Sequence, residues 1–159
     1  MATNFLQAAG SHGFIVTPVT IMTTELNTLA NGSCAASSVG GTSGVFTQTN
    51  FGQAIWAELE FIAGGAFTPT AGGFLALWWL FSEAGSTFEK TVTATDQPRS
   101  PDAIIPLFAS AYATNDIAKA NGIIRLPAYD TKGYMANHSG VSLPGSGNII
   151  KVGPIATQY

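Results

Sequence analysis

The amino-acid sequence predicts an all-β protein: one antiparallel β-sandwich or jelly roll over residues 19–159, preceded by an extended N-terminal arm over residues 1–18. Three observations favour this fold. Short segments that are apolar, or that alternate between apolar and polar residues, recur along the chain. The 18 glycines and 8 prolines separate these segments. No repeat with a period of about 20 to 50 residues is present. A length of 159 residues suits a single domain.

The arm is predicted because residues 1–18 contain Gly10 and Gly13, which disfavour a helix. This segment has no charged residue, yet it carries several large apolar side chains, which need a partner surface on this subunit or a neighbour. The alternative is a frayed terminus. The residues that we expect to make arm contacts are Phe5, Leu6, Phe14 and Ile15.

The first elements of the domain follow from local composition. Thr20–Leu26 is rich in threonine and predicts a strand, and the small residues of 30–44 predict a long loop. Gln53–Ala63 alternates with period two, which places Ile55, Ala57, Leu59 and Phe61 on one face and Trp56, Glu58, Glu60 and Ile62 on the other.

Phe74–Phe81 is apolar on both faces, which indicates a central strand covered on both sides, with a short buried helix as the alternative. Glycine-rich turns join it to Gln53–Ala63 and favour antiparallel pairing of the two.

Later segments continue the β pattern. Pro106 limits Asp102–Leu107 to an edge strand, and Asn121-Gly122 predicts a turn. Ala109–Lys119 has only a weak helical pattern. The remaining segments that predict strands are Thr87–Thr95, Ile123–Leu126, Tyr129–Asn137 and Asn148–Ala156.

Charged residues make up only 9% of the chain, against a usual share of roughly 25%. The formal net charge is −3, so we expect no nucleic-acid partner. The longest apolar run has eight residues, far fewer than the about 20 of a membrane-spanning helix, so we also expect no membrane partner. A surface this poor in charge indicates burial in an assembly.

The sequence contains little that predicts catalysis. One cysteine (Cys34) and two histidines (His12 and His138) cannot form a zinc site within one chain. Glu58 and Glu60 share a strand face about 6–7 Å apart, which suits a glycosidase pair or, more simply, an exposed face. We therefore expect no enzymatic activity, no catalytic residues, no metal and no cofactor.

The three tryptophans are the strongest candidates for contacts within the folded domain. Trp56, Trp78 and Trp79 lie on two segments that we expect to be neighbouring strands. Adjacent Trp78 and Trp79 must point to opposite faces, so one of them lies outside the core, under a second layer, at an interface or on a sugar-binding platform. We expect the interface.

The last third of the chain carries a resemblance. It contains Gly122-Ile123-Ile124-Arg125-Leu126-Pro127, then Asn137-His138-Ser139-Gly140, then Ser146-Gly147-Asn148. This order resembles small virion proteins of tailed bacteriophages. The resemblance implies a β-sandwich on the capsid exterior that acts as a decoration (cement) protein, with the major capsid protein as its partner and a homotrimer as its assembly. The alternative is a receptor- or glycan-binding module on a tail or fibre.

Overall fold

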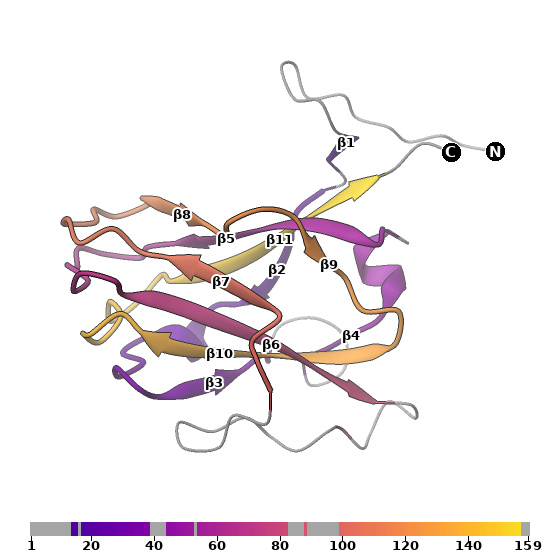
Figure 1. Ribbon diagram of the computed structural model, residues 1–159, viewed down its shortest axis with the longest axis horizontal. Coiled ribbons are helices and arrows are strands. Elements are labelled where there is room, and N and C mark those ends of the chain that lie inside the picture. The colour runs from indigo at the N-terminus through magenta and orange to yellow at the C-terminus, as the bar shows by residue number, and fades with distance from the viewer. Residues whose placement is uncertain are drawn as a thin grey trace.

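A computed structural model of the chain describes residues 14–15, 17–38, 44–52, 54–82, 88 and 99–156. Its strands form two antiparallel sheets that face each other, so the predicted β-sandwich is confirmed (Figure 1). The first sheet has six strands: β1 (Phe14–Ile15), β2 (Val19–Met22), β5 (Trp56–Ile62), β8 (Ile117–Lys119), β9 (Ile124–Arg125) and β11 (Ile149–Ala156). The second has five: β3 (Cys34–Ala36), β4 (Val45–Phe46), β6 (Phe74–Ser82), β7 (Ala103–Pro106) and β10 (Asp130–His138).

The predicted alternation is confirmed from Trp56 to Ile62, whereas Ile55, which the pattern places on the face of Ala57, lies before β5 and is exposed. In β5, Ala57, Leu59 and Phe61 are buried, whereas Trp56 and Glu58 are exposed on the outer face of the six-stranded sheet. Alternate residues of a strand point to opposite sides of a sheet. The buried residues of β5 therefore share one face, and this face packs against the inner face of the other sheet. The core between the sheets includes Ile21, Met22, Leu59, Phe61, Leu75, Leu77, Trp79, Met135, Ile150 and Val152.

The fully apolar strand is also confirmed. β6 lies between β10 and β7, and its residues from Leu75 to Leu80 are buried on both faces. Its inner face joins the main core, and its outer face joins a second apolar group, here called the outer cluster. The buried members of the outer cluster are Ala76, Trp78, Leu80 and Ala136, and Cys34, Phe74, Phe88 and Tyr134 pack against them.

Some local predictions are wrong. The strands predicted from Gln53–Ala63 and Phe74–Phe81 do not pair, because β5 and β6 belong to opposite sheets. The strand predicted over Thr20–Leu26 ends at Met22, and the 3-10 turn η1 (Thr24–Leu26) follows it. The loop predicted over 30–44 contains β3, whose backbone pairs with β10.

Other predictions hold or lie outside the described residues. β7 is an edge strand, as Pro106 predicts, and β10 and β11 match their predicted segments within a residue. Ala109–Lys119 forms only an isolated bridge at Tyr112 and the short strand β8. A second 3-10 turn, η2 (Gln48–Phe51), precedes β5. Thr87–Thr95 lies outside the described residues apart from Phe88.

The N-terminal arm is described only at its end. Phe5 and Leu6 lie outside the described residues, and β1 pairs through its backbone with Ile155 and Ala156 of the same chain. In Figure 1, β1 and the end of β11 extend beyond the sandwich. The jelly-roll connectivity and the arm as a contact element stay predictions.

Two buried asparagines fasten the loops at the ends of β10 and β11. Asn137 donates to the carbonyls of Leu29 and Val141, both at 2.8 Å, and accepts from the Ser139 N–H at 2.9 Å. Asn148 donates to the Pro144 carbonyl at 2.7 Å and accepts from the Gly64 N–H at 3.1 Å. Both side chains are fully buried. Their amide groups therefore supply hydrogen bonds to loop backbone N–H and C=O groups that have no partner in a neighbouring strand and are shielded from water.

No helix in the described ranges is both long and apolar enough to cross a membrane.

Candidate functional site

The three tryptophans do not form one surface. Trp56 is 40% exposed on β5, whereas Trp78 and Trp79 on β6 are each 1% exposed. The Trp78 indole N–H donates to the Arg99 carbonyl at 2.9 Å within the outer cluster. Trp79 lies in the main core, where its ring meets Phe51 edge to face at 6.0 Å. Trp78 and Trp79 therefore offer no surface to a partner, and only Trp56 does.

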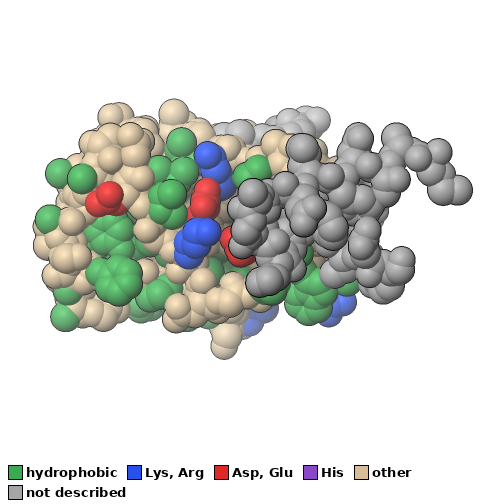
Figure 2. Space-filling model, turned by 90° about the horizontal axis from the view of Figure 1, so that it is seen from above, with side chains coloured by type: hydrophobic (Ala, Val, Ile, Leu, Met, Phe, Trp, Pro, Cys, Tyr) green, Lys and Arg blue, Asp and Glu red, His purple; other side chains and the backbone are tan. Residues whose placement is uncertain are grey.

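Other exposed apolar side chains lie on the edge strands of the two sheets or just after them. Ile104 on β7, Phe108 after β7 and Ile117 on β8 are 45%, 75% and 52% exposed, and β7 lies against β8. Phe108 and Ile117 border the same hollow and are here called the apolar edge, whereas Ile104 faces outward from the five-stranded sheet, as its cross-strand partner Ala76 does. Figure 2 shows hydrophobic side chains over the end of the molecule where β8 lies.

A shallow hollow of about 220 Å³ adjoins the apolar edge. Phe108 and Ile117 border it, together with Ser110, Ala111, Tyr112 and Asp116. The buried Tyr112 hydroxyl accepts a hydrogen bond from the Phe108 N–H at 3.2 Å, which holds the segment after β7 in place. An exposed ring beside a hollow on a rigid edge is a surface that another protein can cover.

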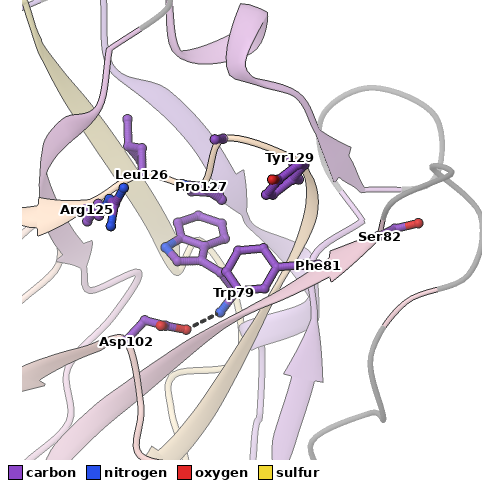
Figure 3. A pocket seen from close by; sticks show the side chains of 9 residues that line it. Trp79, Phe81, Ser82, Asp102, Arg125, Leu126, Pro127 and Tyr129 are labelled. Atoms are coloured by element: carbon purple, nitrogen blue, oxygen red, sulfur yellow. Dashed lines mark hydrogen bonds between the residues drawn. The ribbon is translucent and has the colours of Figure 1, made fainter.

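A larger pocket of about 590 Å³ lies at the end of β6. Trp79, Phe81 and Ser82 of β6 form one wall, and residues 125–129 of β9 and the loop after it form the opposite wall. Asp102, just before β7, completes the lining. In Figure 3 the rings of Trp79, Phe81 and Tyr129 surround the space, and Arg125 lies on the side of the Trp79 indole nitrogen.

The charged groups at this pocket are not balanced. Asp102 accepts from the Trp79 backbone N–H and from the Arg99 guanidinium, each at 2.7 Å. Arg99 also donates to the Trp79 carbonyl at 2.6 Å and lies 5.6 Å from the centre of the Phe81 ring. Arg125 has no ion-pair partner among the described residues. Since Arg99 neutralises Asp102, the pocket keeps the positive charge of Arg125.

The pocket also contains an unsatisfied donor. The indole N–H of Trp79 is buried and has no hydrogen-bond partner among the described residues. Leaving a buried donor without a partner costs about 1–3 kcal/mol. Native structures rarely keep such a group without a reason.

The carboxylate pair lies away from both hollows. Glu58 accepts from the Lys119 ammonium at 3.3 Å, and Glu60 is in register between Lys119 of β8 and Lys151 of β11. Figure 2 shows acidic and basic side chains next to each other near the middle of the face in view. Their arrangement is that of an exposed cross-strand charge ladder.

The remaining reactive side chains are separate. Cys34 on β3 packs against the outer cluster, and its burial raises the pKa of the thiol. The His138 ring lies 4.8 Å from the Phe74 ring, and His12 lies outside the described residues. No group of three or more potential metal ligands occurs in the part of the chain that the structure describes.

Comparison with known protein families, with curated protein sequences and with solved structures found no match. The functional argument therefore rests on the residues themselves. Sequence reasoning identified Trp56 but missed the apolar edge and the pocket. Phe108 lies two residues after Pro106, the last residue of an edge strand, and this position is the one local signal that could have indicated its exposure.

Proposed function

We propose that this protein is a structural virion component: a decoration (cement) protein that binds the head shell of a tailed bacteriophage from outside and bridges its subunits, as a homotrimer. The observation that carries the proposal is the apolar edge on a chain with only 9% charged residues. The resemblance of the last third of the chain to small phage virion proteins supports the same function.

The mechanism is burial of surface between rigid subunits. A sheet edge that is already ordered loses little conformational freedom on association, so more of the free energy of burial remains as affinity. The apolar edge would lie between copies of this chain, and a trimer places three identical edges around one axis. The N-terminal arm, with Phe5 and Leu6, and the exposed Trp56 would contact the major capsid protein.

The test is co-sedimentation with head shells that lack the protein. The wild-type chain should bind at a fixed ratio to the major capsid protein, and removal of residues 2–16 should leave a folded chain that no longer binds. Binding of the truncated chain at wild-type level would reject the role of the arm. No binding of the intact chain to any head shell would reject the proposal itself.

A second candidate function, a receptor- or glycan-binding module of a tail or fibre, is favoured by one observation. The pocket at the end of β6 combines aromatic rings with the charged side chains of Arg125 and Asp102, which is the mixture that a polar ligand with apolar faces requires. Glycan-array binding that disappears on mutation of the pocket would support this function. An array without a positive glycan would reject it.

A further inference from the structure

We infer that the pocket at the end of β6 binds an acidic saccharide, with the carboxylate of the sugar on Arg125. This inference rests on the second candidate function and specifies its ligand. Two features of the pocket carry it: an unbalanced positive charge and an exposed aromatic ring. Its volume of about 590 Å³ is within the roughly 300–1,000 Å³ of pockets that bind small ligands.

The charge selects an anion. Asp102 is engaged by Arg99 through a 2.7 Å ion pair and by the Trp79 backbone, so it does not neutralise Arg125. A guanidinium presents its donors in a planar fork that fits the two oxygens of a carboxylate. The whole chain has a net charge of −3, so attraction of an anion to this point arises from the pocket and not from the protein as a whole.

The exposed aromatic ring favours a sugar over a simple anion. Tyr129 is 65% exposed and borders the pocket, so its ring offers a flat apolar surface to the C–H face of a sugar. A simple carboxylate would use only Arg125, and a neutral sugar would use only Tyr129.

The experiment is a titration of the whole chain, followed by two-dimensional NMR of its backbone and indole N–H groups. The three probes are methyl glucuronide, methyl glucoside and acetate. We expect methyl glucuronide to bind about tenfold tighter than either of the others. It should shift the indole N–H signal of Trp79, whose side chain lines the pocket, while the signal of Trp78, which lies in the outer cluster, stays unchanged.

Two variants test the assigned contact. Arg125→Gln should reduce the preference for glucuronide over glucoside to less than about twofold. Lys151→Gln removes the same charge from the outer face of the six-stranded sheet and should leave the preference intact. Thermal unfolding of both variants checks that each is folded.

Each of the other possible outcomes would reject a specific part of the inference. Equal binding of glucuronide and glucoside would reject the acidic ligand and leave a neutral glycan site. Equal binding of acetate and glucuronide would reject the saccharide and leave a simple anion site. No binding of any probe would reject the inference, whereas the glycan array decides the second candidate function separately.

Discussion

Replacing Phe108 by serine should weaken self-association without changing the fold. Phe108 is 75% exposed on the apolar edge, and a phenylalanine side chain buries about 150–250 Å² when fully covered. Covering the exposed part therefore removes about 150 Å² of apolar surface from water. At about 25 cal/mol per Å², this is about 3–4 kcal/mol for each ring buried between copies. The dissociation constant of the assembly should rise by a factor of about a hundred or more.

The assay is sedimentation equilibrium of the wild-type chain and of Phe108→Ser over the same concentration range. Tyr129→Ser is the matched control, because Tyr129 is a similarly exposed aromatic residue that borders the pocket and not the apolar edge. The control should assemble like the wild type. A wild-type chain that stays monomeric at the highest attainable concentration, or a Phe108→Ser variant that assembles equally well, would refute the reasoning.

Three further predictions concern stability and reactivity. Burial raises the pKa of Glu25, but hydrogen bonds from the Ser38 side chain and from nearby backbone N–H groups outweigh it, so the pKa lies below its ordinary value of 4.5. The charged form therefore stabilises the fold above this pH, and the stabilisation is lost as the pH falls through the lowered pKa. The melting temperature of Glu25→Gln should lie below that of the wild type near neutral pH, and the gap should narrow on acidification below the ordinary pKa of 4.5; a gap that does not change with pH would contradict this. Asn137→Ala should cost roughly 2–4 kcal/mol of unfolding free energy by denaturant titration, because the Ser139 N–H loses its acceptor and the carbonyls of Leu29 and Val141 each lose one of their two donors. The exposed control Asn121→Ala should cost less than about 0.5 kcal/mol, and similar losses for both would be the contrary result. Cys34, whose pKa is raised by burial, should react with iodoacetamide more slowly than a cysteine in an unfolded peptide; faster alkylation would show an activated thiol instead.

The strands that could be predicted are those in which burial repeats along a few consecutive residues. Ala57, Leu59 and Phe61 alternate with polar positions, and Leu75–Leu80 are apolar on both faces, so each segment specifies its own layer. Which strands pair with each other could not be predicted in the same way. No residue pattern within β5 or β6 indicates that the two strands lie in opposite sheets. β3 was missed because it owes its strand conformation to the neighbouring β10 and not to its own small side chains.

The candidate sites could be predicted less well, for a related reason. Alternation places Trp78 outside the main core, but it does not show that the outer cluster covers this side chain. The pocket combines β6, Asp102 and residues 125–129, which are far apart in the sequence and meet only after folding. The imbalance between Arg125 and Asp102 depends on the ion pair with Arg99, which no spacing rule indicates.

The most direct test of the central claim is the copy number of this chain in purified phage particles, measured by quantitative mass spectrometry against the major capsid protein. A decoration protein of the head should be present at one copy per capsid subunit or at a simple fraction of it that trimers on the lattice allow. A handful of copies per particle, or complete absence from the particle, would contradict that claim.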